Sequence, residues 1–368
     1  MKPKYFKSKS GNVPLPVFFP DATRAVLKTL DSIDIEQTKT NGILVNTYHL
    51  YKDLGKQVVK KHGGIREFMN FHGAVISDSG GFQVMSLAKT LGGKITDEGV
   101  TFKPQGEAKI KLTPEDSIEF QLALQTDMVV VLDDFTTPTA TYEEAKETVE
   151  RTLLWAKRCK STFAKATADK EKKDVPYLLG VVQGGFYQDL REYCTKELVK
   201  IGFDGLGYGG WPLRPAQGKP GEMEFDYESA KTIADNAPEN YFLYGLGVGK
   251  PHEIVKLTKM GFNIFDCVLP TRDARHKRLY VYNADSMSDI NVRVPDFYSY
   301  FVPDKQKYYH DTEPVSKACD CLLCTNYSRS YLAHLFRSNE MTAGRLATIH
   351  NLRFYSILME KLRFENTD

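Results

Sequence analysis

Short apolar runs recur along the first three quarters of the chain, and each is followed by a polar or glycine-containing turn. Near-continuous apolar runs of this length are typical of parallel strands that are buried on both faces. The pattern therefore predicts eight strands, over residues 16–20, 42–46, 74–78, 128–133, 177–183, 203–209, 241–247 and 262–268.

Helix signals lie between several of these runs. Thr113 precedes a proline and two acidic residues, and Thr141 precedes Glu144 at the spacing of a capping box. Pro251 begins a third predicted helix, which extends to Met260. Eight strands that alternate with helices over about 270 residues predict an α/β fold, a (β/α)8 TIM barrel. A doubly wound parallel sheet shows a similar alternation, so the pattern alone leaves it open.

The alternation stops near Arg272, and a cysteine-rich segment follows. We therefore expect residues 1–278 to form the barrel with its active site. Residues 279–350 are expected to form an inserted zinc-binding subdomain. Residues 351–368 are expected to form a C-terminal helix that packs back on the barrel.

The composition narrows the class of protein. With 49 basic and 47 acidic side chains, the formal net charge is +2, which excludes a wholly polybasic protein but allows a local basic site. No apolar run approaches the ~18 residues of a membrane span, and the N-terminus lacks the apolar core of a signal peptide. Six cysteines are too few for a disulfide scaffold in a chain of 368 residues. These features predict a cytoplasmic protein without a membrane segment.

Polar residues and glycines end most of the predicted strands. In a (β/α)8 barrel, the carboxyl ends of the strands form the active site. Here these ends supply Asn46, Asp78, Asp133, Gln183, Gly209, Gly210, Gly247 and Asp266. A single aspartate in such a place is more often a turn or N-cap residue, but three in one ring favour a site. No histidine is among them, which argues against a mononuclear metal hydrolase in the barrel mouth.

The segment from Asp78 to Gln83 has the strongest local signal. Its paired glycines permit a ligand to approach the backbone closely, and Phe82 offers a flat face for a planar ring. Gln83 and Gln183 carry amides that can pair with the edge of a heterocycle. A carboxylate such as Asp266 is ionised at pH 7 and can attack an anomeric carbon while a second carboxyl group protonates the leaving base.

Five motifs together resemble the tRNA-guanine transglycosylases, also called queuine tRNA-ribosyltransferases. They are DSGGFQ from Asp78, VQGG from Val182, FDCVLPTR from Phe265, NTYHL from Asn46 and LTPE from Leu112. The resemblance extends, with the motifs in the order of the family, from about Pro16 to about Phe354.

The resemblance implies that the enzyme exchanges the wobble guanine of certain tRNAs for a 7-deazaguanine base. It implies that Asp266 is the nucleophile at the ribose carbon and that Asp78 is the general acid and base. The groups that it assigns to base binding are Asp133, Gln183, Gly209, Gly210 and Phe82. The target nucleotide has to leave its stack, which costs little in an unpaired anticodon loop. Two displacements at one carbon would give retention.

Two segments depart from the bacterial pattern of the family. Asp133-Asp134-Phe135 stands where bacterial members have Asp-Glu-Cys, and its acidic pair is closer to queuine-using members. Residues 211–215 replace a loop whose closing Glu helps to receive the aminomethyl group of the incoming base. Pro215 cannot pair with an ammonium, and Arg214 would repel one if its side chain pointed inward. The identity of the incoming base therefore stays open between the aminomethyl, cyano and queuine forms. If the loop repacks around Trp211 and another acid takes the place of the missing Glu, the aminomethyl base would again be favoured.

A metal site is predicted near the C-terminus. Cys319, Cys321 and Cys324 form a short knuckle, and 25 residues separate Cys324 from His350. Three thiolates and one imidazole make a closed tetrahedral zinc site, which is structural because no position is left for a substrate. His334 is a rival for the fourth position, and the resemblance favours His350.

A basic stretch follows the last predicted strand. Arg272, Arg275, Lys277 and Arg278 place four positive charges within seven residues, beside the expected mouth of the active site. Lys250 is a further candidate. Such charges contact RNA phosphates, which positions the RNA without reading its sequence.

The sequence leaves two other functions to be weighed. A tRNA-binding partner subunit of weak activity would share this fold, but such subunits lose the catalytic aspartates, and both Asp78 and Asp266 are present. A zinc-dependent barrel hydrolase is disfavoured because the cysteine cluster lies outside the barrel mouth. Members of the family are commonly homodimers, so the resemblance also implies a homodimer.

Overall fold

A ring of eight parallel strands forms the centre of the molecule, in a computed structural model that describes residues 2–103, 109–171, 174–215 and 222–365. In chain order the strands are β3 (Val17–Pro20), β4 (Gly42–Val45), β5 (Ala74–Ser77), β9 (Met128–Val130), β10 (Tyr177–Val182), β11 (Gly205–Tyr208), β14 (Phe242–Gly245) and β15 (Ile264–Cys267). Each of them lies within one of the eight predicted ranges. Strands such as β4, β5 and β11 are buried at every position, which explains their uninterrupted apolar character.

The ring closes between its first and second strands. Along the sheet the order is β3-β15-β14-β11-β10-β9-β5-β4, so neighbours in space are neighbours in sequence. The Ala22 N–H donates to the Leu44 carbonyl at 2.7 Å, and a parallel bridge joins Asp21 to Leu44. The prediction of a (β/α)8 barrel is confirmed, because a doubly wound sheet would reverse its strand order at a switch point.

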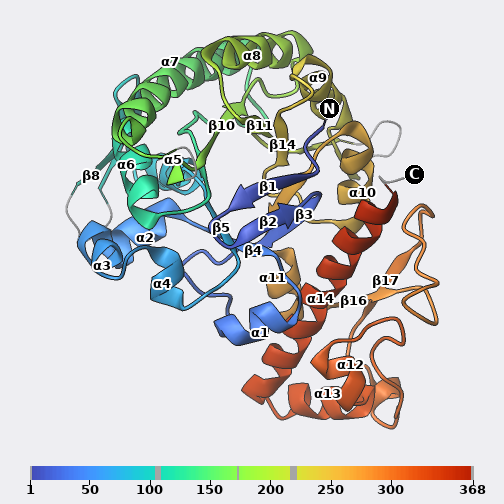
Figure 1. Ribbon diagram of the computed structural model, residues 1–368. Helices are drawn as coiled ribbons and strands as arrows, with labels where there is room; N and C mark the ends of the chain where they lie inside the picture. The colour runs from blue at the N-terminus through green and yellow to red at the C-terminus, as the bar shows by residue number, and fades with distance from the viewer. Residues whose placement is uncertain (1, 104–108, 172–173, 216–221, 366–368) are drawn as a thin grey trace.

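Helices surround the ring (Figure 1). They are α1 (Ser32–Gln37), α2 (Thr47–Asp53), α3 (Gly55–Lys61), α4 (Ile65–Met69), α5 (Gly81–Thr90), α6 (Pro114–Leu124), α7 (Tyr142–Thr167), α8 (Gln188–Ile201), α9 (Tyr227–Asn236), α10 (Pro251–Met260) and α11 (Leu269–Arg275). The predicted N-cap Thr113 begins α6 and the predicted capping box at Thr141 begins α7. Both are capping boxes in the structure, with Thr113 paired to Asp116 and Thr141 paired to Glu144. The third predicted helix is α10, with the predicted bounds.

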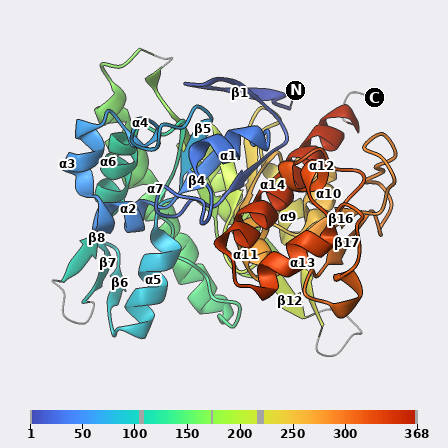
Figure 2. The ribbon, with the colours of Figure 1, turned by 90° about the horizontal axis from the view of Figure 1, so that it is seen from below.

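Short antiparallel elements lie at the two ends of the barrel. β1 (Tyr5–Ser8) and β2 (Gly11–Pro14) cross the amino end, where the Phe6 ring packs edge-on against Tyr177 and Phe242 at the starts of β10 and β14. Figure 2 shows further strands at the opposite end. These are β6 (Lys94–Thr96), β7 (Gly99–Phe102), β8 (Ile110–Leu112), β12 (Leu213–Pro215) and β13 (Met223–Phe225).

The C-terminal unit leans against one side of the barrel (Figure 1). It contains β16 (Leu279–Tyr282), β17 (Tyr298–Phe301), the 3-10 helix η2 (Gln306–Tyr308), α12 (Leu322–Asn326), α13 (Arg329–Arg337) and α14 (Met341–Glu365). Helix α14 joins this unit to the barrel, since the Tyr355 hydroxyl donates to the Gly249 carbonyl at 2.5 Å. The Tyr355 ring also lies 4.5 Å from that of Phe18 on β3, and Arg363 donates to the Pro16 carbonyl.

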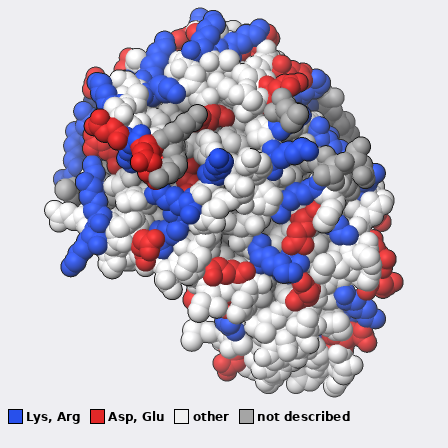
Figure 3. Space-filling view, in the orientation of Figure 1, with Lys and Arg blue, Asp and Glu red and all other residues white. Residues whose placement is uncertain are grey.

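Figure 3 shows lysines and arginines, with acidic side chains between them, on the face that β1 and β2 cover. In the part of the chain that the structure describes, no helix is long and apolar enough to cross a membrane.

Candidate active site and metal centre

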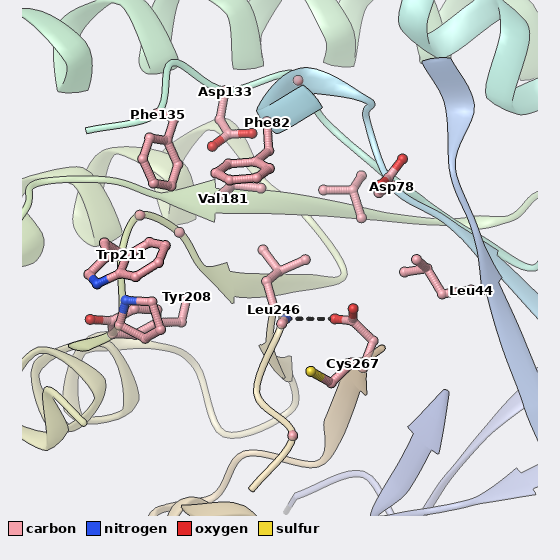
Figure 4. Close-up of a pocket in the computed structure, with 18 of the residues that line it drawn as sticks. Leu44, Asp78, Phe82, Asp133, Phe135, Val181, Tyr208, Trp211, Leu246 and Cys267 are labelled. Atoms are coloured by element: carbon pink, nitrogen blue, oxygen red, sulfur yellow. Dashed lines mark hydrogen bonds between the residues drawn. The ribbon is translucent and has the colours of Figure 1, made fainter. Parts of the chain in front are cut away.

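A pocket of about 460 Å³ opens at the carboxyl ends of the ring strands (Figure 4). Its volume is typical of a site for a small organic ligand. The lining of this one pocket includes the predicted residues Asp78, Phe82, Gln83, Asp133, Gly209, Gly210, Gly247 and Asp266. Gln183 lies directly behind the wall, where it is fully buried.

Asp78 follows β5, and its carboxylate accepts three hydrogen bonds. Asn46 Nδ2 donates to Oδ2 at 2.7 Å, and the N–H groups of Thr47 and Gly80 donate to Oδ1 at 3.0 Å each. Gly80 has a φ of 73°, and a Cβ there would lie 2.9 Å from the Tyr48 nitrogen, so the turn requires glycine. Burial nevertheless raises the pKa of Asp78 to about 7. The group therefore changes protonation near neutral pH, as a proton-transfer group must.

Asp266 lies on β15 and faces the same pocket. The Tyr244 hydroxyl donates to its Oδ1 at 2.7 Å, and the Gly247 N–H donates to the same oxygen at 2.9 Å (the dashed line in Figure 4). Within the described residues, Oδ2 accepts no hydrogen bond. Burial raises the pKa of Asp266 to about 7, although both hydrogen bonds favour the anion. One oxygen is thus held in place while the other is available to a ligand.

The predicted base-binding groups form a connected layer. Gln183 Nε2 donates to Asp133 Oδ2 at 2.6 Å, and Gln183 Oε1 accepts from the Thr136 N–H at 3.1 Å. Burial raises the pKa of Asp133 to about 6. Beside them, a Cβ on Gly209 would lie 2.5 Å from Val181 Cγ1, so only glycine fits at the end of β11. This layer offers a carboxylate and backbone groups to the edge of a planar ligand, and the Gln183 amide holds the carboxylate from behind.

Aromatic rings gather at one side of the pocket (Figure 4). Phe82 is 50% exposed, and its ring lies edge-on to Phe135 with 5.0 Å between the centroids. Tyr208 and Trp211 line the pocket nearby. Gln83 also lines it, and its Oε1 is buried without a hydrogen-bond partner in the described residues. The site therefore combines a face for stacking with an unused acceptor.

The two segments that depart from the family pattern differ in where their side chains lie. Phe135 lines the pocket, whereas Asp134 is buried behind it and pairs with Arg151 at 2.5 Å. Arg214 is not a pocket residue, because its guanidinium contacts Glu224, Asp226 and Glu228 on and after β13. The inward orientation that would repel an ammonium does not occur.

The predicted basic residues divide into two groups. Arg272 and Lys250 line the pocket, and Lys250 Nζ pairs with Glu253 at 3.1 Å. The other three contact neighbours outside the pocket lining. Arg275 donates to the Thr271 carbonyl, Lys277 pairs with Asp304 and Arg278 lies over the Tyr300 ring.

Sequence reasoning missed three residues near the site. Tyr244 has only the signal of an apolar strand position, so a core role is the natural interpretation. Glu253 resembles an ordinary acid in the first turn of α10. Asp21 directly follows β3 and so has the positional signal that singled out Asp78. Burial raises the pKa of Asp21, and its charge in turn raises the pKa of both Asp78 and Asp266.

The four predicted metal ligands form one cluster, with Cys319 and Cys321 before α12, Cys324 within it and His350 on α14. Ligand atoms of Cys319, Cys321, Cys324 and His350 all lie within 4.8 Å of one another. His350 Nδ1 is 3.5 Å from the Cys321 sulfur and 3.2 Å from the Cys324 sulfur. In a tetrahedral zinc site, sulfur and nitrogen ligands lie roughly 3.6 Å apart. The cluster can hold one metal ion, and the donor set fits zinc, whereas the rival His334 is exposed on α13.

Residues around the cluster orient it and connect it to the barrel. His350 Nε2 lies 2.8 Å from the Tyr280 carbonyl, a hydrogen bond that keeps Nδ1 turned toward the thiols. The next residue, Asn351, donates to the carbonyls of Pro270 and Arg278 at 3.0 Å each. Helix α14 therefore holds the metal cluster and the segment that follows Asp266 in one arrangement.

Comparison with known proteins identifies the family. A family model described as queuine tRNA-ribosyltransferase matches residues 5–365. The queuine tRNA-ribosyltransferase of Acinetobacter baylyi is 40% identical over 357 residues, which cover 96% of this chain and 84% of that protein. The protein of the same name from a Shewanella species is 39% identical over 355 residues, covering 96% of this chain and 87% of that protein. The chain therefore belongs to the queuine tRNA-ribosyltransferase family.

Proposed function

We propose that this protein is a tRNA-guanine transglycosylase, which exchanges the wobble guanine of certain tRNAs for a 7-deazaguanine base. The observation that carries the proposal is the pair of buried carboxylates, Asp78 and Asp266, which line one pocket beside a polar layer suited to a base edge. Family membership supplies the reaction class, and the two carboxylates supply the groups that a double displacement needs.

In the first displacement, Asp266 acts as the nucleophile. Its Oδ2 attacks C1′ of the ribose, the bond from C1′ to N9 of guanine breaks, and the electron pair leaves with the base. Tyr244 and Gly247 hold the other oxygen and so orient the carboxylate. Asp78 gives its proton to the leaving guanine, and a covalent ester joins the tRNA to Asp266.

In the second displacement, N9 of the incoming base attacks C1′ and expels the Asp266 carboxylate. Asp78 takes the N9 proton, which returns both carboxyl groups to their starting state. Inversion at each step gives net retention. A pKa of about 7 lets Asp78 give and take a proton at neutral pH with small cost in either direction.

The base would lie between the aromatic face and the polar layer. Phe82 stacks on the ring, while Asp133 and the Gly209-Gly210 backbone meet its hydrogen-bonding edge, with Gln183 holding the Asp133 carboxylate from behind. Stacking and edge recognition of a base that has left its helix are the usual means by which proteins read single-stranded RNA.

For the incoming base, we propose that a free ammonium is not what the pocket prefers. Glu253 is the acid that the pocket offers in place of the missing loop Glu, and Lys250 already pairs with it. Competition between 7-aminomethyl-7-deazaguanine and the uncharged 7-cyano-7-deazaguanine tests this, because only the first carries an ammonium. Far better incorporation of the aminomethyl base would overturn this proposal.

The partner is the tRNA anticodon loop. Arg272 and Lys250 lie in the wall of the pocket, where they can contact phosphates beside the target nucleotide, and Arg275, Lys277 and Arg278 extend the basic region. We further propose a homodimer that acts in the cytoplasm. A structural zinc ion held by Cys319, Cys321, Cys324 and His350 would stabilise the C-terminal unit and take no part in the exchange.

A covalent trap tests the proposal against the alternative of a tRNA-binding subunit with weak activity. Incubation of the protein with tRNA, without any incoming base to resolve the ester, should give a denaturant-resistant adduct that is absent in Asp266→Asn. Full tRNA binding without an adduct in the wild type would favour the binding subunit. An adduct that persists in Asp266→Asn would place the nucleophile elsewhere.

A further inference from the structure

Beneath the polar layer of the pocket lies a buried arginine. Arg191, in the first turn of α8, is fully buried. Within the described residues, no carboxylate lies at ion-pair distance from its guanidinium. A buried charge without a counterion is costly, and proteins retain one only where its hydrogen bonds hold something in place.

The hydrogen bonds of Arg191 go to the two strand ends that carry the base-binding groups. Nη1 donates to the Val182 carbonyl at 2.6 Å and to the Gly209 carbonyl at 2.8 Å, and Nε donates to the Gly185 carbonyl at 2.9 Å. The guanidinium also lies over the Tyr208 ring, 4.6 Å from its centroid. It thus joins the carboxyl ends of β10 and β11.

One of these contacts determines the direction of a peptide in the pocket wall. In a planar trans peptide, the carbonyl of one residue and the N–H of the next point in opposite directions. Because the Gly209 carbonyl points to Arg191, the Gly210 N–H points away from it. Gly209 and Gly210 line the pocket and Arg191 does not, so that N–H is turned toward the ligand side.

The space around Gly210 shows how closely the arginine is fitted. A Cβ on Gly210 would lie 3.3 Å from Arg191 Nη2 and 3.2 Å from Gln183 Oε1. Nη2 is buried and has no hydrogen-bond partner in the described residues. A donor left without an acceptor is a cost that a purely structural contact would avoid.

We propose that Arg191 is a positioning residue, which orients the Gly209-Gly210 peptide so that its N–H meets the carbonyl oxygen of the bound base. The inference rests on the proposed function, since it assumes a guanine-type base in this pocket. Guanine presents O6 and N7 as acceptors on one edge. Position 7 is carbon in a 7-deazaguanine, so O6 is the acceptor that outgoing and incoming bases share.

The test compares guanine with 2-aminopurine, which lacks the 6-carbonyl and also the hydrogen on N1. The dissociation constant of each free base is measured by calorimetry for the wild type, Arg191→Met and Arg191→Lys. The wild type should bind guanine at least ~10-fold more tightly than 2-aminopurine, the size of one good hydrogen bond. In Arg191→Met this ratio should fall by at least ~3-fold, with the N1–H contact to Asp133 accounting for what remains, and KM for tRNA should be unchanged within ~2-fold. Arg191→Lys should restore part of the ratio, because an ammonium can still donate to both strand-end carbonyls.

Arg353→Met is the matched control, because it also removes a buried guanidinium but one that pairs with Asp320 and Glu360 near the metal cluster. It should lower stability and keep the wild-type ratio. If Arg191→Met does not fold, Arg191→Gln takes its place with the same expected fall.

An unchanged ratio in a folded Arg191 variant would overturn the positioning role. A wild type that binds no guanine would overturn both this role and the proposed function. A wild type that binds guanine but exchanges none of it into tRNA would overturn the proposed function alone, and the ratio would still decide the role of Arg191.

Discussion

The barrel mouth and the cysteine-histidine cluster are both buried polar sites, but they differ in how far their polar groups find partners. In the mouth, burial raises the pKa of Asp78 and Asp266 to about 7, and no donor among the described residues reaches the second oxygen of Asp266. In the cluster, three sulfurs and one nitrogen face a common centre, and His350 is oriented by the Tyr280 carbonyl. The carboxyl groups of the mouth are buried at a cost in free energy, and a substrate can use them. The four ligands of the cluster, by contrast, are all satisfied once a metal binds.

The comparison teaches that burial alone does not distinguish function from stability. What distinguishes them is whether partner groups satisfy the buried ones within the protein. The two sites are also connected, since Asn351 beside His350 holds the carbonyls of Pro270 and Arg278 after the Asp266 strand. Loss of the metal should therefore disturb the mouth through α14, while changes in the mouth should leave the cluster intact.

The largest expected effect tests the cluster. Cys324→Ser removes one of four ligands, and the binding free energy of a structural zinc is folding free energy, so stability should fall by about 5 kcal/mol or more. Zinc content and thermal unfolding measure this. The control is Cys194→Ser, a buried thiol outside the cluster, for which a loss of about 1–3 kcal/mol and full zinc content are expected. A Cys324→Ser protein with one zinc per chain and wild-type stability would show that Cys324 is not a ligand of a stabilising metal.

The next effect tests the mouth through the dependence of stability on pH. The folded pKa of Asp266 is raised to about 7, so the native state retains a proton that the unfolded chain has released. Below the unfolded pKa of about 4, the carboxyl group is protonated in both states and its burial costs little. As pH rises to about 7, the unfolded chain releases the proton before the native state does, so the free energy of unfolding falls. Asp266→Asn should therefore be more stable than the wild type at pH 8, by on the order of 1–4 kcal/mol, and should differ little at pH 4.

Denaturant unfolding at both pH values measures this difference, with the exposed Asp304→Asn as the control that should show none. An Asp266→Asn protein that is less stable than the wild type at pH 8 would show that the carboxylate contributes to the fold, as the cluster does.

A smaller effect concerns the rim of the mouth. Arg272→Ala should weaken tRNA binding by about 1 kcal/mol and reduce the slope of log K against log salt by about 1, because one phosphate contact is lost. The KM of the free base should stay the same. Binding at several salt concentrations measures the slope, and Lys317→Ala on the C-terminal unit serves as the control. A change in base choice with unaltered tRNA affinity would show that Arg272 contacts the base and not the RNA phosphates.

The smallest effect tests how closely the carboxylates of the mouth are coupled. The charge of Asp21 raises the pKa of both Asp78 and Asp266, so Asp21→Asn should lower both. Ionisation of Asp266 at lower pH should shift the acidic limb of the pH–rate profile of kcat/KM by a few tenths of a pH unit toward acid. Measured profiles for the two proteins decide this, and a shift toward higher pH would mean that Asp21 acts in another way.

Several parts of the molecule were predictable because their signals are local. Each barrel strand is a short, mainly apolar run, because burial on both faces favours apolar side chains. Thr113 and Thr141 begin helices by capping groups within three residues. The cysteines stand within one short knuckle, so their number and spacing already indicate a metal.

Other parts were not predictable because their meaning depends on neighbours far along the chain. Nothing local distinguishes Tyr244 from a core residue, or Arg191 from a surface residue of an amphipathic helix. Arg214 could have pointed into the pocket, and only the acids on and after β13 turn it away.

By itself, then, the sequence determined the eight strands, the aspartates at their ends, the metal ligands and a resemblance to one family. Periodicity, capping and motif spacing act over a few residues, and the chain records them directly. The tertiary structure decided which groups share a pocket and which oxygen of Asp266 is held. It also decided where Arg214 and Asp134 point, and that a buried arginine joins β10 to β11. Those outcomes depend on burial and on hydrogen bonds between segments that meet only when the barrel closes.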